Sequence, residues 1–339
     1  MSAIASGYDI LDAIVDELPI AGVIGLVGDV DVSAVSGYLD GRPWCDRNGI
    51  EYVGVTSYQL SDARERSMIA ALDIDLLLVL GWQRLIPRWL IEHSRLGAIG
   101  VHGSSHGIAG GRGRSPQNWA LILGDHEFHL SIFRIDERVD SGGVIATRSF
   151  PLTAFDDIKS SYYKTGITTA AMLVDAFRSG RLAAGDGDPQ SDEALYLPQR
   201  TPEDGGIDWR RNTAEIHGFV RSLTRPYPGA ATSFAGASVT IWSARPFAMP
   251  PETFAAAVPG EVVRAFAQGD LLVRTGDGIL LIEDYEFAGG KGVEIAKGTT
   301  FTSSDHLAQM EAIASRHEAR YPNAPLHPDI LAQAGRVLR

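Results

Sequence analysis

Residues 97–146 hold the side chains best suited to chemistry. His102 ends a predicted buried strand, where the ligands of open α/β sheets collect, and a glycine-rich loop and a helix follow it. Asp140 lies in a second loop, again between predicted strands. Its carboxylate can accept a hydrogen bond from one histidine ring nitrogen while the other nitrogen faces a substrate. The pattern predicts a base with its orienting partner; the alternative is a structural histidine beside glycine.

Nearby residues offer binding groups. The run Gly107–Gly113, with Arg112 and Arg114, can cradle a diphosphate through backbone N–H groups and guanidinium contacts. It can equally be a flexible loop whose arginines pair with local acids. His126 and His129 lie three residues apart, but the sequence places no third ligand beside them, so we predict no metal site.

The elements that must position these residues alternate between helix and strand. Apolar periodicity predicts helices at 9–18, 67–72, 87–93, 115–123 and 156–179, and strands at 22–27, 75–80, 98–102, 129–135 and 143–149. Helices between buried strands indicate an α/β fold with a mainly parallel sheet covered on both faces. Few residues precede the first helix, so the usual first strand of such a sheet is very short or truncated.

The pattern changes after a connector rich in Gly, Asp, Pro and Ser, residues 180–203. A helix at 214–223 is followed by short strands at 231–244, 260–268, 270–275 and 278–285, which suggest a small closed barrel. A further amphipathic helix spans 307–317. We therefore predict three parts: a catalytic domain at 1–198, a barrel domain at 199–303 and a helical tail at 304–339.

Composition narrows the class of protein. The 339 residues are 45% apolar and 21% charged, which argues against disorder and coiled coil. A single cysteine, Cys45, allows no intramolecular disulfide and fits a reducing compartment, so we expect a cytoplasmic protein. No apolar run approaches the roughly 18 residues of a membrane span.

The charge pattern argues against nucleic acid as a partner. The net charge is −12, from 30 basic and 42 acidic residues. From residue 206 onward there are 13 basic and 14 acidic residues, which leaves 17 and 28 in the first 205. Neither part carries the basic surface that binding to a phosphate backbone requires.

Several ordered motifs resemble the folate-dependent formyltransferases, most closely the N-formyltransferases of nucleotide-linked amino sugars. The family has a strand end of the type Asn-x-His-Gly-Ser, an Arg-Gly-Arg-x-Pro-x-Asn-Trp segment and an Asp-x-Gly loop. The matching segments here are Gly100–Ser104, Arg112–Trp119 and Val139–Gly142. Leu80–Pro87 looks like the segment beside the folate pocket, and 200–209 and 223–230 look like the sugar-modifying branch.

The resemblance implies a Rossmann-like catalytic domain, an OB-like C-terminal barrel and 10-formyltetrahydrofolate as the formyl donor. His102 is then the proton acceptor or oxyanion partner, and Asp140 orients it and stabilises its charge. The implied cofactor contacts are Trp82, Leu85, Ile86, Gly103, Ser104 and Val139. The implied substrate contacts are Ser105, His106, Arg112, Arg114 and Asn118. For Trp82, packing in the core is the alternative.

Two departures from the family pattern affect the site. Gly100 stands at the catalytic position where the family has asparagine, and losing one oxyanion donor typically costs about 10²–10³ in rate. Backbone N–H groups, the hydroxyls of Ser104 and Ser105, or His106 can compensate. The following loop, residues 105–111, is also about two residues longer than usual.

Three functions follow from this pattern. The leading hypothesis is formyl transfer to a nucleotide-linked amino sugar, in a chain whose tail permits a homodimer. Methionyl-tRNA formyltransferase is disfavoured by the charge. A divergent protein without the family asparagine, acting as a hydrolase, on another amine or as a binding module, is the main rival.

Overall fold

The computed structural model describes residues 1–27, 35, 37–185, 187–191, 193–289 and 294–336. Its elements group into two units, each interrupted along the sequence. Unit 1 is Met1–Arg112, Glu127–Pro151 and Tyr162–Ala194; unit 2 is Gly113–His126, Leu152–Ser161 and Leu195–Arg339. Among the described residues, none of the helices combines the length and apolar character that crossing a membrane demands.

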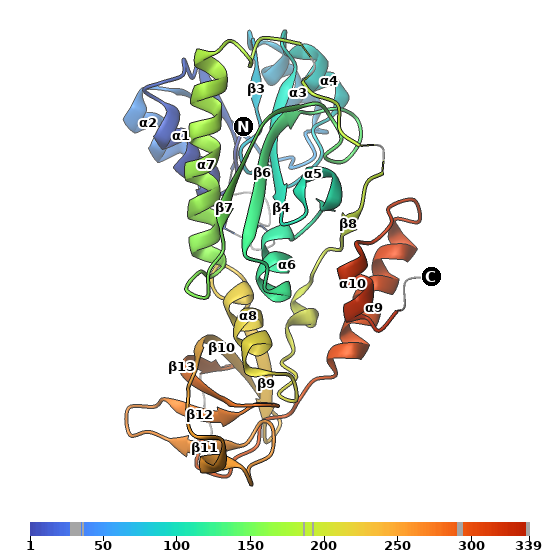
Figure 1. Cartoon of the computed structure of the whole chain (residues 1–339). Coiled ribbons are helices and arrows are strands. Elements are labelled where there is room, and N and C mark those ends of the chain that lie inside the picture. The colour runs from blue at the N-terminus through green and yellow to red at the C-terminus, as the bar shows by residue number, and fades with distance from the viewer. Residues whose placement is uncertain (28–34, 36, 186, 192, 290–293, 337–339) are drawn as a thin grey trace. The chain divides into compact units, whose positions relative to one another are not determined.

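Unit 1 is an α/β unit (Figure 1). Its elements are α1 (Ala5–Ile14), β1 (Gly22–Leu26), α2 (Arg42–Asn48), β2 (Glu51–Val55), α3 (Ala63–Ala70), β3 (Leu77–Leu78), α4 (Arg88–His93), β4 (Ala98–Ser104), α5 (Gly107–Gly110), β6 (Glu127–Arg134), β7 (Val144–Pro151) and most of α7 (Ile158–Arg178). β1 pairs with β2 in parallel, and a second sheet has the order β3-β4-β6-β7. Its β3–β4 pair is parallel, whereas β4–β6 and β6–β7 are antiparallel.

The first residues of the chain connect the two sheets of unit 1. Ser2 N donates to Ile24 O at 3.1 Å, and Leu80 N donates to Met1 O at 2.9 Å. These bonds make residues 1–4 the short extended segment that the sequence predicted ahead of the first helix. The predicted α/β class, with its Rossmann-like parallel strands, is confirmed.

Apolar faces decide how the helices of unit 1 pack. In α1, Tyr8, Ile10, Leu11 and Ile14 are buried, at spacings that place them on one helix face. The helix begins at Ala5, four residues before the predicted start. Figure 1 shows α7 running beside α1, and a Cβ on Gly166 would lie 3.8 Å from Ile10 Cγ1. The pair α2 and β2 was not predicted, because both are short.

Unit 2 combines an antiparallel sheet with helices. Its elements are α6 (Pro116–Leu123), β8 (Tyr196–Leu197), η2 (Pro202–Gly205), α8 (Thr213–Leu223), β9 (Ala230–Phe234), β10 (Ala237–Pro246), η3 (Pro251–Phe254), β11 (Val262–Ala265), β12 (Leu271–Arg274), β13 (Ile279–Phe287), α9 (His306–Arg320) and α10 (Pro328–Gln333); β5 (Arg112–Gly113) spans the boundary with unit 1. The strands have the order β11-β12-β13-β10-β9. The predicted single strand at 231–244 is a hairpin, because Ala235 and Gly236 both adopt positive φ and reverse the chain.

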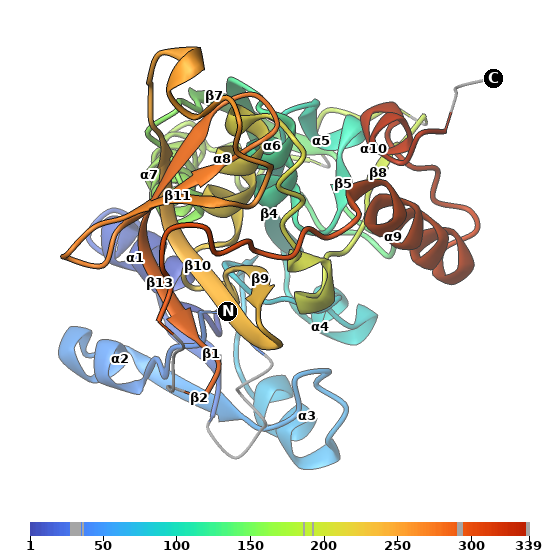
Figure 2. The ribbon, with the colours of Figure 1, turned by 90° about the horizontal axis from the view of Figure 1, so that it is seen from below.

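One apolar core joins the helices and the sheet of unit 2. It contains Trp119 from α6, Phe219 from α8, Ile241 from β10, Ile313 from α9 and Ile330 from α10, all buried. α8 can approach α6 because Gly218 faces it: a Cβ there would lie 2.7 Å from Leu121 O. Figure 2 shows α9 beside α10. The helix at 115–123 therefore packs with the C-terminal elements.

Candidate active site

Strand β4 positions the histidine. Its burial pattern leaves almost no residue exposed, as expected for a strand paired on both sides, with β3 and with β6. His102 is 9% exposed, and its neighbours in register are Ser131 on β6 and, beyond it, Thr147 on β7. The hydroxyls of Ser131 and Thr147 lie 2.8 Å apart. A row of polar groups thus crosses three strands on the face that carries His102.

The loop after β6 positions the carboxylate. Asp136 Oδ1 accepts hydrogen bonds from Ser141 Oγ at 2.6 Å and from Arg138 N at 2.9 Å, which closes the loop. Asp140 has a φ of 48°, in the left-handed region that non-glycine residues rarely adopt. Gly142 cannot be replaced, because a Cβ there would lie 1.9 Å from Arg134 O. The segment Asp140–Gly142 therefore fixes the backbone of Asp140, from which the carboxylate extends.

The imidazole of His102 lies between a carboxylate and a carbonyl. Nδ1 of His102 lies 3.4 Å from Oδ2 of Asp140, and Nε2 lies 2.8 Å from the carbonyl oxygen of Gly111. A carbonyl oxygen only accepts, so Nε2 is the donor in the second contact. The sequence led us to expect that this second ring nitrogen faces a substrate, but here it faces the Gly111 carbonyl because the glycine-rich loop folds back over the ring. The site thus pairs a largely buried imidazole with a carboxylate.

Gly100 lies two residues before His102 on the same face of β4, opposite Phe133 of β6. A Cβ built on Gly100 would lie 3.1 Å from both Phe133 Cζ and Ile135 Cγ1, tighter than most real contacts. Phe133 is 4% exposed. Apolar side chains therefore fill the space into which a side chain at position 100 would extend.

The glycine-rich loop contains both structural and candidate binding groups. Ser104 Oγ donates to Gly107 O at 2.7 Å and accepts from His106 N at 3.1 Å, so this buried hydroxyl shapes the turn into α5. Ser105 Oγ is buried and has no hydrogen-bond partner among the described residues. Arg112 is 6% exposed, whereas Arg114 is exposed. Of the two arginines, only Arg112 is placed inside the protein.

The predicted folate contacts differ in exposure. Trp82 is 6% exposed and makes an edge contact with Tyr58 at 4.8 Å between ring centroids; its Nε1 is buried without a partner in the described chain. Ile86 is buried in the same apolar cluster. Leu85 is 67% and Val139 37% exposed, which leaves two apolar side chains on the loops after β3 and β6.

Two further predicted contacts are engaged in packing. A Cβ on Gly103 would lie 2.4 Å from His129 O, so the glycine allows β4 and β6 to approach. Asn118 belongs to unit 2, where its Nδ2 donates to Ser222 O at 2.6 Å. The Oδ1 atom of Asn118 is buried and has no hydrogen-bond partner among the described residues.

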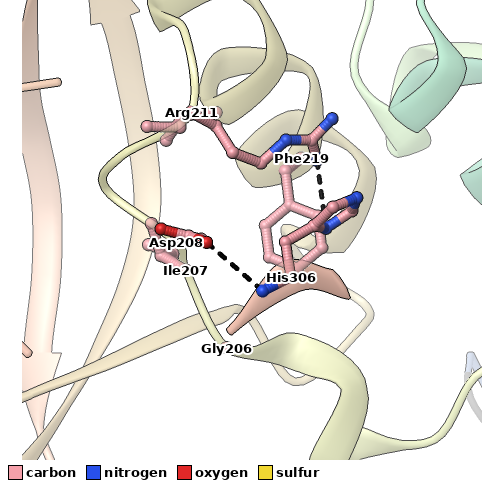
Figure 3. A pocket seen from close by; sticks show the side chains of 7 residues that line it. Gly206, Ile207, Asp208, Arg211, Phe219 and His306 are labelled. Carbon is pink, nitrogen blue, oxygen red and sulfur yellow. Dashed lines mark hydrogen bonds between the residues drawn. The ribbon is translucent and has the colours of Figure 1, made fainter. Parts of the chain in front are cut away.

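A small cavity in unit 2 holds none of the predicted site residues (Figure 3). Its volume is about 10 Å³, which suits one water molecule. Arg211 Nη1 lies 3.2 Å from His306 Nδ1, and His306 N donates to Asp208 Oδ2 at 3.3 Å. Burial, followed by the charge of Arg211, lowers the pKa of His306. The cavity lies beside a hydrogen-bonded polar network and is too small for a substrate.

Sequence reasoning did not identify four features of the site: the Gly111 carbonyl, the Ser131–Thr147 pair, the Phe133 and Ile135 side chains beside Gly100, and Gln190 of the connector. Gln190 Nε2 donates to Asp140 O at 2.9 Å and to Gly142 O at 2.7 Å. Alternation along 129–135 could have placed Ser131 on the face of His102. No local pattern could have linked Gln190 to a loop 50 residues away.

The fold and site together define an α/β protein with a histidine–carboxylate pair between a central strand and a loop after the neighbouring strand, and an additional antiparallel β unit. Two family models match the chain: Formyl transferase over residues 43–176, and Formyl transferase, C-terminal domain, over residues 200–300. The chain therefore belongs to the formyl transferase family. Membership confirms the prediction of a folate-dependent formyl-transfer enzyme, in a family whose formyl donor is 10-formyltetrahydrofolate.

Relatives and solved structures agree with this assignment. A methionyl-tRNA formyltransferase of Pelobacter propionicus is 31% identical over 238 residues, which are 66% of this chain and 70% of that protein. HypX from Aquifex aeolicus, solved with tetrahydrofolic acid, matches with a TM-score of 0.56 and 18% identity over 84% of this chain and 45% of HypX. This chain thus spans less than half of HypX.

A third similar protein is the N-formyltransferase of Helicobacter canadensis, solved with folinic acid and dTDP-3-aminofucose. It matches with a TM-score of 0.55 and 14% identity over 84% of this chain and 97% of its own. At such identities the likeness concerns the fold.

Proposed function

We propose that the protein transfers the formyl group of 10-formyltetrahydrofolate to the amine of a nucleotide-linked amino sugar, at the pair formed by His102 and Asp140. The observation that carries this proposal is the 3.4 Å contact between the two side chains, which lie 38 residues apart in the sequence. A buried imidazole oriented by a carboxylate is suited to assist acyl transfer, either as the proton acceptor or as the partner of the negative charge that develops on the carbonyl oxygen.

The chemistry requires few groups from the protein. When bound, 10-formyltetrahydrofolate supplies the formyl carbon on its N10 nitrogen. The amine nitrogen of the acceptor bonds to that carbon, the bond from the carbon to N10 breaks, and N10 takes up a proton as the amine loses one. His102 is the proton acceptor or the partner of the formyl oxygen in this step, and Asp140 orients its imidazole.

The residues on the loops after β3 and β6 fit a folate. Trp82 Nε1 is a buried donor with no partner in the described residues, as a heterocycle with acceptor nitrogens and oxygens requires. The exposed side chains of Leu85 and Val139 offer apolar surface to a flat ring. We assign these three residues to the folate pocket.

Two observations support a small acceptor over a tRNA. The chain carries a net charge of −12, and its part from residue 206 onward has 13 basic against 14 acidic residues. Tight binding to tRNA normally depends on basic surface that neutralises phosphates. Arg112, buried at the end of the glycine-rich loop, is our candidate for contact with the acceptor's diphosphate.

The test is turnover with a panel of acceptors. The protein is incubated with 10-formyltetrahydrofolate and dTDP- or UDP-linked amino sugars, and tetrahydrofolate release and formylated sugar are both measured. We expect release that depends on one acceptor. His102→Ala and Asp140→Asn should each lose at least about 100-fold in rate, whereas His126→Ala, an exposed histidine, should not. Release that depends on no acceptor contradicts the proposal.

A second function is favoured by the packing around Gly100. Glycine at position 100 provides no amide donor of the family pattern, and Phe133 and Ile135 pack closely against the place where such a side chain would begin. This second candidate is hydrolysis, in which water accepts the formyl group and formate is released. Tetrahydrofolate and formate appearing in equal amounts without any amine would identify it.

A further inference from the structure

Gln190 lies in the connector after α7, within unit 1, and all of its amide groups are used. Its Nε2 donates to the carbonyls of Asp140 and Gly142, and its Oε1 accepts from Arg112 Nη2 at 2.8 Å. A primary amide has two N–H groups and one carbonyl. Only this orientation satisfies both backbone carbonyls and the guanidinium, so the assignment of the amide oxygen and nitrogen is fixed by its partners.

The first contact of Gln190 acts on the catalytic carboxylate. Asp140 has a φ of 48°, a conformation that side chains disfavour and that surrounding contacts must maintain. Gln190 holds the carbonyl of Asp140 itself and that of Gly142, two residues further on. The Gln190 amide therefore holds in place residues 140–142, the segment that carries the carboxylate in contact with His102.

The second contact of Gln190 is with Arg112, which lies on the side of the imidazole opposite Asp140. Arg112 is 6% exposed, and its Nε has no hydrogen-bond partner in the described part of the chain. Gln190 accepts a hydrogen bond from Nη2 of this buried guanidinium. Arg112 directly follows Gly111, whose carbonyl accepts from His102 Nε2.

The two groups that hold the imidazole of His102 are thus linked through a single side chain. We propose that Gln190 is a positioning residue, which fixes the Asp140 loop relative to the Gly111–Arg112 segment and so keeps His102 gripped between carboxylate and carbonyl. This inference rests on the proposed function of the pair His102–Asp140.

Two variants separate the contacts. Gln190→Met keeps the length of the side chain and removes all three hydrogen bonds. Gln190→Glu keeps an acceptor for Arg112 but has no N–H for the carbonyls of Asp140 and Gly142. Glu193→Gln, at an exposed position of the same connector, is the matched control. Thermal unfolding establishes that each variant is folded, and Gln190→Glu serves if Gln190→Met does not fold.

The readouts are steady-state kinetics and the ring nitrogen NMR signals of His102, assigned by comparison with His102→Gln. We expect both Gln190 variants to lower kcat by about 10–100-fold, with KM within about threefold of wild type, and to shift or broaden the His102 signals. Glu193→Gln should change neither readout.

Unchanged His102 signals overturn the proposal, whatever happens to kcat, because the imidazole would then be held without Gln190. Altered signals with kcat within about twofold of wild type overturn it as well. If the wild-type protein turns over no acceptor, the proposed function fails, and the ring signals alone decide the role of Gln190.

Discussion

At the scale of single residues, the two contacts of His102 determine what it can do. Both ring nitrogens are engaged, with the carbonyl of Gly111 and the carboxylate of Asp140. These contacts fix the orientation of the imidazole in the site. Gly100, on the same strand face, contributes no side chain, and Phe133 and Ile135 would have to shift to admit one.

This packing predicts the outcome of restoring the family side chain. Gly100→Asn should destabilise the protein by about 1–3 kcal/mol, because Phe133 and Ile135 must move. It should also lower formyl transfer. Chemical unfolding and the acceptor assay measure the two effects.

Two companion variants separate volume from chemistry. Gly100→Ala adds only the Cβ and should cost less stability than asparagine. Combining Gly100→Asn with Phe133→Leu should recover part of the stability. If Gly100→Asn alone transfers the formyl group faster than the wild type, the prediction is wrong. The site would then lack only the amide side chain.

At the scale of elements, unit 2 depends on neutral histidines between its helices. Burial, followed by the charge of Arg221, lowers the pKa of His217 on α8 to about 4. His306, the first residue of α9, has its pKa lowered by burial and by Arg211. Its Nδ1 lies 3.2 Å from Arg211 Nη1, so a proton on Nδ1 would face the guanidinium and disturb the contact between α9 and the segment ahead of α8.

The stability of the protein should therefore fall on mild acidification. In the unfolded chain a histidine binds a proton near pH 6.5, whereas His217 and His306 resist protonation when folded. The unfolded state then binds more protons below pH 6.5, and stability is lost as the pH falls from 6.5 toward 4. The melting temperature should drop by about 2–6 °C between pH 7 and pH 5.5.

Variants locate the effect. His217→Gln should flatten this pH dependence, while His126→Gln, at an exposed position, should leave its slope unchanged. A melting temperature that stays constant from pH 7 to pH 5.5 would show that neither buried histidine is coupled to folding.

At the scale of the whole molecule, two units share one chain that passes between them more than once. Residues 113–126 and 152–161 belong to unit 2 although the chain on both sides of each segment belongs largely to the α/β unit, and Trp119 and Ile122 are part of the unit 2 core. There Trp119 Nε1 donates to Pro198 O at 2.8 Å, and the guanidinium of Arg200 lies 5.0 Å from the Trp119 ring. A fragment that ends near residue 198 would lack the C-terminal residues that cover Trp119. It would therefore expose this fully buried side chain.

The charge of the molecule makes a prediction about partners. At low salt, where phosphate binding is strongest, initiator tRNA should not shift in a native gel with this protein at micromolar concentrations. The methionyl-tRNA formyltransferase of Pelobacter propionicus, run alongside, serves as the comparison. A shift abolished by raising the salt would contradict the preference for a small acceptor.

The sequence by itself determined the family, the order of most helices and strands, and the two side chains that meet at the site. Periodicity and motifs depend on residues a few positions apart, and they are enough to place His102 at the end of a predicted strand and Asp140 in a loop between predicted strands. Short elements such as α2 and α10 carry too few apolar positions for this and were missed.

Only the tertiary structure decided what surrounds that pair. Gln190 reaches Arg112 across 78 residues and Asp140 across 50, and the Gly111 carbonyl faces His102 because of how the loop folds back. Phe133 and Ile135 fill the space beside Gly100 because β6 pairs with β4 in one particular register. Such contacts depend on the path of the whole chain, which no local pattern of residues encodes.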